Sequence, residues 1–158
     1  SGEAKVAFNV AEREKIVMMS NASSAPGLTK DKEWAWRITE DEGKQFARLL
    51  KTFQEMDVPR KSVDIVYVSD EAISAVVGEK LYPFLLKKFG IEHGKPVAIT
   101  YKSFDLAPQI APIVANNPDM VAVAGLPENA SKTIRELKRQ GYKGRMIGSQ
   151  IFADPNIL

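Results

Sequence analysis

Residues 118–149, PDMVAVAGLPENASKTIRELKRQGYKGRMIGS, contain the pattern that decides the fold. Met120 to Gly125 form a short apolar run, which is typical of a strand covered on both faces. The segment that follows is charged, has helical spacing and ends at Gly141, and residues 145–149 form a second strand-like run. A strand, a helix and a strand in this order predict a βαβ unit with parallel strands.

The same alternation continues toward the N-terminus of this stretch. Strands are predicted at 63–69 (VDIVYVS) and 96–102 (PVAITYK), and helices at 40–58, 70–89 and 105–117. Thr39 is the predicted N-cap of the first helix, and Pro59 marks its end. Pro83 should bend the second helix and Pro112 should kink or break the third. Four strands separated by helices predict an α/β domain with a doubly wound parallel sheet.

The first forty residues carry a weaker pattern. Residues 4–15 suit a helix whose apolar side contains Val6, Val10 and Phe8, and Ile16 to Ser20 suit a short buried strand. A polar, turn-rich segment, NASSAPGLTKDKE, separates this strand from a short extended piece at Trp34 to Thr39. We therefore expect a helix and two short strands ahead of the larger α/β domain.

Composition narrows the classes of function. The 22 basic and 20 acidic residues are mixed along the 158-residue chain and give a net charge of +2, which does not suit a nucleic-acid surface. The absence of cysteine excludes a thiol nucleophile, a disulfide framework and a Cys-type zinc site. No apolar run is long enough to span a bilayer, and no signal peptide is expected within the chain.

Catalytic signatures are missing as well. The only histidine, His93, lies between Glu92 and Gly94 in a predicted surface turn, which favours a solvated residue over a catalytic base or a metal ligand. The chain has no G-x-G-x-x-G after a strand, no phosphate-binding P-loop and no G-x-S-x-G elbow. The sequence therefore predicts a protein that is not an enzyme and holds no cofactor or metal.

Small polar residues follow the predicted strands. Ligands of open parallel sheets bind outside the carboxyl ends of the strands, so these positions are the candidate site. In SNASSAPGLT, a polar surface loop and a carboxylate-binding turn are both open interpretations. Asp70 and Glu71 suit either an acidic pair or, more simply, the cap of the helix that they precede.

The order of these segments resembles the leucine/isoleucine/valine-binding type of periplasmic solute-binding proteins. MMSNASSAPGLTKDKEWAWRIT (18–39) is similar to the stretch in which a lobe-one strand ends in a serine-rich turn and the chain crosses into lobe two. The N-P-D-x-V start of 117–149 and the G-S after its last strand are also similar to this family. The resemblance implies a type I periplasmic binding fold, with residues 1–36 as a remnant of lobe one and the hinge crossing and residues 37–158 as lobe two.

The resemblance also implies where a solute is held. Residues expected to contact it are Asn21, Ser23, Ser24, Glu71, Ala72, Leu126 and Gln150. Ser23 and Ser24 match the turn that binds the carboxylate of the solute. Ala72 and Leu126 fall where the family often has aromatic residues, and Gln150 stands where a glutamate pairs with the ammonium group of an amino acid. Because a neutral amide supplies no ion pair, amides and aromatic acids join amino acids as expected solutes.

By resemblance, the expected function is capture of a small carboxylate-bearing solute between two lobes for delivery to an ABC transporter permease, in the periplasm or on an extracellular lipoprotein. A ligand-sensing domain of a regulator or receptor is the alternative, since the same fold serves both. The strand at Ile16 to Ser20 is expected to lack a sheet partner within the chain, and an unpaired apolar strand favours pairing with a second copy. Packing onto its own lobe and pairing with another fragment of the parent protein are the alternatives, and a homodimer is the favoured expectation.

Overall fold

The computed structural model describes residues 2–153 and 155–157, and the chain divides into two compact units, residues 1–45 and 46–158. Within the described residues, no helix combines the length and the apolar character that crossing a bilayer requires. Each unit has its own secondary structure and is described by itself.

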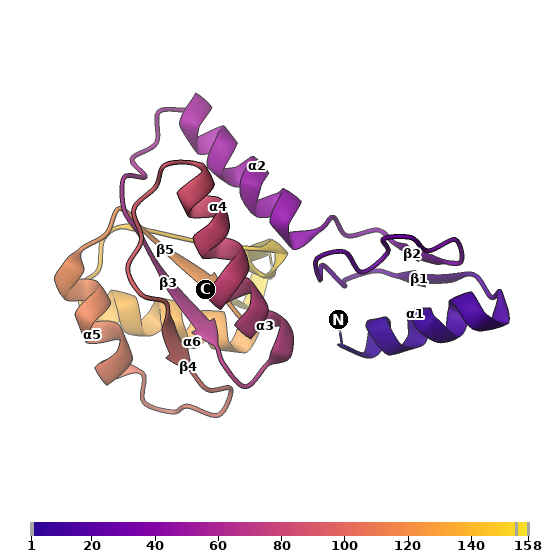
Figure 1. The fold of residues 1–158 in the computed structure, drawn as a ribbon. Helices are drawn as coiled ribbons and strands as arrows, with labels where there is room; N and C mark the ends of the chain where they lie inside the picture. Colours follow the sequence, from indigo (N-terminus) through magenta and orange to yellow (C-terminus); the bar gives the residue numbers. More distant parts are fainter. Residues whose placement is uncertain (1, 154, 158) are drawn as a thin grey trace. The chain divides into compact units, whose positions relative to one another are not determined.

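The first unit packs one helix beside two short strands (Figure 1). Helix α1 (Gly2–Glu14) precedes β1 (Met18–Ser20), which pairs in parallel with β2 (Ala35–Arg37). The Glu12 carboxylate accepts hydrogen bonds from the backbone N–H groups of Trp34 at 2.7 Å and Glu33 at 3.1 Å, and so ties the helix to the start of β2. Polar anchoring thus supplements a small apolar core.

Three predictions for this unit are wrong. The strand predicted to be buried is not, since Met19 in β1 is 60% exposed. Phe8 and Ala11 are the buried side of α1, whereas Val6 is 68% exposed, because the helix turns Phe8 and not Val6 toward the strands. The strand at the predicted position also has a partner within the chain, since Met19 lies opposite Trp36 in β2. The turn-rich segment between them is long enough to let the two strands run parallel.

The second unit is built on a four-stranded parallel sheet, as predicted. The strands are β3 (Val63–Val68), β4 (Val97–Ile99), β5 (Met120–Ala124) and β6 (Arg145–Gly148), in the spatial order β4-β3-β5-β6. Val66 pairs with Val97 on one side of β3 and with Val123 on the other. Every residue of β3 and β5 is buried, which explains their nearly continuous apolar sequences.

Helices cover both faces of this sheet (Figure 1). One face is covered by α2 (Glu42–Glu55), whose first turn belongs to the first unit, and by α3 (Ala72–Val76), a π-helical segment (Val77–Leu81) and α4 (Tyr82–Lys88). The other face is covered by α5 (Ala107–Asn116) and α6 (Pro127–Arg139). Short 3-10 turns at Gln150–Ala153 and Pro155–Ile157 follow β6. Two apolar cores, one on each face, make the unit a doubly wound α/β sandwich.

One local prediction is wrong, and two others concern prolines within helices. Thr39 does not cap α2: its hydroxyl donates to the Asn21 carbonyl, and the backbone N–H of Gly43 donates to Asp41 instead. Pro83 lies just after a π-helical segment, Val77–Leu81, so the helix is irregular where the bend is predicted. Helix α5 continues through Pro112, so the expected break does not occur.

Candidate functional site

The strand order of the second unit reverses between β3 and β5. From β3 the chain crosses one face of the sheet and forms β4 on one side of β3. Strands β5 and β6 then form on the other side of β3, and the helix that connects them, α6, covers the other face of the sheet. A crevice outside the carboxyl ends of two such strands is where open parallel sheets bind ligands. This topology brings the segments at 69–72 and 125–126 to neighbouring positions, because Tyr67 pairs with Ala124 near the end of both strands.

The acidic residues after β3 have structural partners. Glu71 is the N-cap of α3, and its carboxylate accepts bonds from Ile73 N–H at 3.2 Å and from the N–H and hydroxyl of Ser74 at 2.7 Å each. Burial acts to raise the pKa of Glu71, but the bonds from Ser74 and Ile73 outweigh it and lower that pKa. Asp70 accepts a 2.7 Å bond from the backbone N–H of Tyr101. The capping interpretation of Glu71 is thus confirmed.

Tyr101 is a residue of this edge that the sequence did not identify. Strand β4 ends at Ile99 and not at Lys102, so Tyr101 lies in the turn after the strand rather than within it. Its hydroxyl donates to Glu128 at 3.3 Å, and its carbonyl accepts a 3.2 Å bond from the amide of Asn129. Thr100 and Ser103 are residue types that favour turns, and their hydroxyl groups lie 2.8 Å apart. They were the signal in the sequence that the strand ends before Tyr101.

The remaining predicted residues of this unit also follow strands. Leu126 lies between β5 and α6 and is 41% exposed, and Ala72 is exposed at the start of α3. Gln150 follows β6 and is half-buried. Ala72 and Leu126 therefore follow the adjacent strands β3 and β5, whereas Gln150 follows β6, one strand further along the sheet.

In the first unit, Asn21, Ser23 and Ser24 lie together in the turn after β1. The Ser24 hydroxyl donates a 2.7 Å bond to the carboxylate of Glu42, which is only 6% exposed. The Ser23 N–H donates to the Ser20 hydroxyl at 3.2 Å. Among the residues that the structure describes, the Ser23 hydroxyl has no hydrogen-bond partner. Ser23 is therefore the better placed of the two serines to bond a ligand.

An Arg37–Asp41 pair fastens this turn to the segment after β2. Arg37 donates to the Ala25 carbonyl at 2.8 Å and to Asp41 at 3.1 Å. Asp41 also accepts from the backbone N–H groups of Gly27 at 2.9 Å and Gly43 at 3.0 Å. Burial acts to raise the pKa of Asp41, but the bonds from Gly27, Arg37 and Gly43 outweigh it and lower that pKa. The serine turn is thus held by charged hydrogen bonds.

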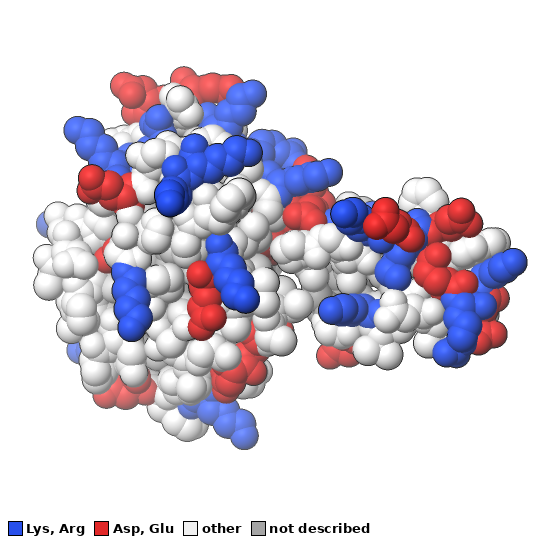
Figure 2. Space-filling model, in the orientation of Figure 1, with Lys and Arg blue, Asp and Glu red and all other residues white. Residues whose placement is uncertain are grey.

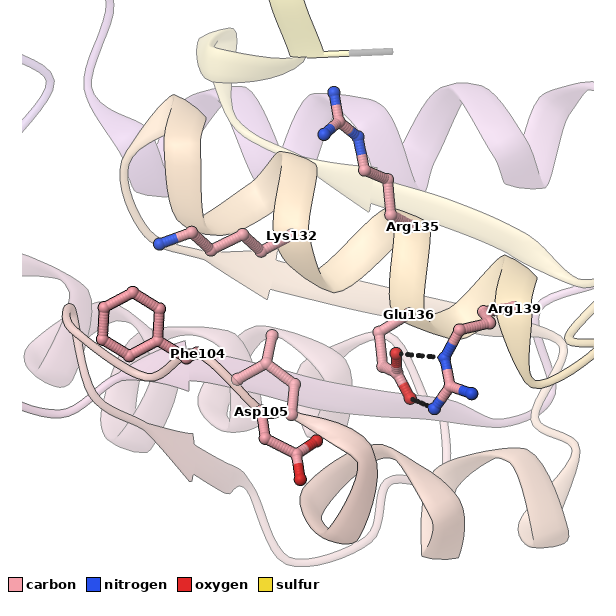
Figure 3. Close-up of a pocket in the computed structure, with 7 residues that line it drawn as sticks. Phe104, Asp105, Lys132, Arg135, Glu136 and Arg139 are labelled. Atoms are coloured by element: carbon pink, nitrogen blue, oxygen red, sulfur yellow. Dashed lines mark hydrogen bonds and ion pairs between the residues drawn. The ribbon is translucent and has the colours of Figure 1, made fainter.

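Three pockets of the second unit contain none of the predicted residues. One, of about 210 Å³, lies between α6 and the start of α5, where Lys132 reaches toward the exposed ring of Phe104 and Arg139 pairs with Glu136 (Figure 3). The other two share Glu92 and His93, away from the carboxyl ends of the strands. In the face shown in Figure 2, acidic and basic side chains alternate without a broad area of one sign. Within the described residues, no cluster of three metal-ligating side chains forms.

No family model and no curated protein matches the sequence. Solved structures do match its fold. A leucine-binding protein from Thermotoga maritima superimposes with a TM-score of 0.78 and 20% identity, over 94% of this chain and 41% of that protein. An ABC transporter solute-binding protein from R. palustris in complex with 4-hydroxybenzoate gives a TM-score of 0.78 at 15% identity, over 98% and 43% of the two chains.

A substrate-binding protein of an ABC transporter from Desulfitobacterium hafniense, in complex with leucine, is similar too, with a TM-score of 0.73 at 17% identity, over 92% of this chain and 43% of that one. The chain therefore has the α/β fold of type I periplasmic binding proteins and spans less than half the length of these neighbours. The neighbours are solute-binding proteins of transport systems rather than enzymes.

Proposed function

We propose that this protein binds a small carboxylate-bearing solute at the carboxyl ends of its strands. The observation that carries this proposal is the reversal of strand order between β3 and β5. It supports the assignment of Glu71, Ala72 and Leu126, which follow β3 and β5, to the site, in a fold whose solved neighbours bind leucine and 4-hydroxybenzoate.

The groups at this edge suit binding better than chemistry. Leu126 and Ala72 offer apolar surface, and Gln150 offers an uncharged amide. Glu71 is engaged as a helix cap, so it is a poor general base. A site of this kind recognises a solute through shape and hydrogen bonds.

The serine turn supplies the anion-binding part of the proposal. Ser23 has a hydroxyl without a partner among the described residues, and Asn21 is exposed beside it. A hydroxyl and an amide donate hydrogen bonds to a carboxylate without the cost of burying a cation. The proposal assigns Ser23 to the carboxylate and Ser24 to the positioning of the turn through Glu42.

We further propose the biological setting of this binding. Residues 1–36 correspond to a remnant of lobe one and the hinge crossing, residues 37–158 correspond to lobe two, and the solute is held between the lobes. In this setting the protein delivers the solute to an ABC transporter permease, either in the periplasm or as a membrane-anchored lipoprotein. It is supported by solved neighbours that are solute-binding proteins of ABC transporters.

A homodimer of this chain is part of the proposal. Met19 and Trp36 lie opposite each other in β1 and β2, and both are more than half exposed, as are Val17 just before β1 and Ile38 just after β2. Alternate residues share one face of a sheet, and parallel sheets are normally covered on both faces. This apolar face, rather than an unpaired strand, is the reason to expect association. Sedimentation of wild type and Trp36→Lys tests it; two monomers would refute it.

Solute binding is tested by ligand-observed NMR with 4-methylpentanoate, 4-hydroxybenzoate and their methyl esters. The acids should bind and the esters should not, because the esters lack the anion. Ser23→Ala should weaken binding by about 1.5–3 kcal/mol, the contribution of one hydrogen bond to a charged group. Ser131→Ala, a hydroxyl deletion on α6, is the control. Equal binding of acids and esters, or no effect of Ser23→Ala, would contradict the proposal.

A further inference from the structure

The second unit has a pocket of about 280 Å³ at the edge where its strands begin, opposite the edge proposed to bind the solute. Polar residues from the start of β3, the segment before β4 and the end of α5 line it. They are Ser62, Asp64, Glu92, His93 and Asn116. Backbone bonds join the first two segments, since the Val63 N–H donates to the Glu92 carbonyl at 2.8 Å. The pocket is therefore built within one unit of the chain.

Asp64 is a buried carboxylate with one weak partner. It is only 9% exposed, and within the described residues its side chain accepts a single bond, from the amide of Asn116 to Oδ2 at 3.3 Å. Its Oδ1 lies beside Gly94 of the pocket lining, where an added Cβ would be 3.0 Å away, and accepts no bond there. Because a buried charge is costly without a partner, Asp64 has an acceptor to offer a ligand.

No lysine or arginine pairs with the acids around this pocket. In residues 2–153 and 155–157, Asp64, Glu92 and the neighbouring Asp119 form no ion pair. The Tyr142 hydroxyl donates to the Pro118 carbonyl in the pocket lining at 2.9 Å. Burial, and then the charges of Asp64 and Asp119, raise the pKa of Tyr142 to about 12. The surroundings of the pocket therefore favour positive charge.

The other polar groups of the pocket also offer lone pairs. Asn116 uses its NH₂ group on Asp64, so its Oδ1 remains an acceptor. The Nδ1 of His93 lies 2.9 Å from the Gly94 carbonyl, which can only accept, so Nδ1 carries the proton and Nε2 of the neutral ring is an acceptor. These groups suit a ligand that brings positive charge and several N–H donors.

We propose that this pocket binds a guanidinium group. Guanidinium is planar, carries several N–H donors and is more weakly hydrated than an ammonium group, so it exchanges water for fixed acceptors more readily. Within the described part of the chain, no group of three His, Cys, Asp or Glu side chains is placed to hold a metal ion, so the acceptors suit a ligand larger than a bare ion. The group belongs either to a small free solute or to an arginine side chain of a partner. The inference is independent of the proposed function.

Probes of matched shape and charge test this inference. Amide chemical shifts of the whole chain are followed during titration with methylguanidinium chloride, at constant ionic strength and well below denaturing concentrations. N-methylurea has the same shape without the charge, and tetramethylammonium has the charge without N–H donors. We expect saturable shifts at residues 62–64, 92–94 and 116–118 with methylguanidinium, and about tenfold weaker binding or less with both controls. No saturable shift there, or equal binding of either control, would overturn the inference.

Two variants test the pocket itself. Asp64→Asn keeps the shape of the side chain but removes its charge, and should weaken binding of methylguanidinium by about tenfold or more. Asp105→Asn, the same change at the other end of α5, is the matched control, since asparagine can still accept the Ala107 N–H. Gly94→Ala places a methyl group beside Asp64 Oδ1 and should weaken binding by about fivefold without changing the charge. Unchanged binding in Gly94→Ala, or in a folded Asp64→Asn, overturns the inference.

A capped amino acid distinguishes the two sources of the guanidinium group. N-acetyl-arginine methylamide is titrated in the same way, with N-acetyl-citrulline methylamide as its uncharged counterpart. Saturable shifts at the pocket with the arginine derivative alone of these two indicate a side chain of a partner protein. Binding of methylguanidinium without binding of the arginine derivative indicates a small free solute. Both results support the pocket, whereas equal binding of the arginine and citrulline derivatives would contradict it.

Discussion

Replacing Asp41 by asparagine tests whether charged hydrogen bonds hold the serine turn. Asparagine has nearly the same shape but only one acceptor oxygen, and its NH₂ group would face donors. The Gly43 bond at Oδ1 can survive, whereas the two bonds at Oδ2, from Gly27 at 2.9 Å and Arg37 at 3.1 Å, are lost. The change therefore removes two of the three bonds that Asp41 accepts.

The magnitude follows from the burial of the pair. A hydrogen bond to a charged group contributes about 1.5–3 kcal/mol when it is well buried. The side chains of Arg37 and Asp41 are 12% and 18% exposed, so we take the lower end of this range for the two bonds. The expected loss is about 2–3 kcal/mol in the free energy of unfolding of the first unit.

Tryptophan fluorescence is the assay, because both tryptophans of the chain, Trp34 and Trp36, lie in the first unit. Urea unfolding at neutral pH gives the difference between wild type and Asp41→Asn. Asp31→Asn, at an exposed position with a positive φ of 57° that asparagine tolerates, should change stability by less than about 0.5 kcal/mol. Equal stability of Asp41→Asn and wild type would refute the assigned role of these bonds.

The lowered pKa of Asp41 adds a pH dependence with a definite sign. Because the folded pKa lies below the unfolded one, this stabilisation is present above the unfolded value of about 3.9 and is lost as pH falls through the folded value. The difference between wild type and Asp41→Asn should therefore shrink below about pH 4. A difference that stays constant down to pH 2 would show that the charge of Asp41 is not the cause.

Three further predictions concern the second unit, and circular dichroism follows each. Gly78→Ala should lower the free energy of unfolding by about 2–3 kcal/mol, because its Cβ would lie 2.2 Å from the Cβ of Tyr67 and force the π-helical segment away from β3; wild-type stability would contradict this. Pro112→Ala should raise it by about 1–2 kcal/mol, since alanine restores an N–H donor within α5; a loss would show that the proline fits without strain. Burial, with the charges of Asp64 and Asp119, raises the pKa of Tyr142 to about 12. The folded state therefore keeps this proton, and its stabilisation is lost as pH rises from about 10 to 12; Tyr142→Phe should remove that loss, and an unchanged alkaline profile would contradict it.

The sheet of the second unit was predictable because its strands are buried on both faces. Such strands, for example Val63–Val68, have nearly continuous β-branched and apolar sequences. The end of β4 was not predictable in the same way, because Thr100 and Tyr101 favour strands in general and only the turn with Ser103 ends it. Tyr101 was missed for this reason.

The segments that follow the strands were predictable, but the hydrogen bonds of their side chains were not. Strand order and turn residues indicate which segments meet at the carboxyl edge, whereas the partner of each side chain depends on contacts between distant residues. Ser23 and Ser24 look equivalent in the sequence, yet Glu42, 18 residues later, takes the hydroxyl of Ser24 alone. The buried face of α1 likewise contains Phe8, whereas Val6 and Val10 are exposed.

The central claim, a carboxylate solute bound at the carboxyl ends of the strands, is tested most directly by mapping amide chemical shifts during titration with 4-methylpentanoate. The account predicts a saturable response at residues 21–24, 70–72 and 125–126, with little change at the opposite edge, near Asp64 and His93. A saturable response centred on Asp64 and His93, or no saturable response at all, would contradict it.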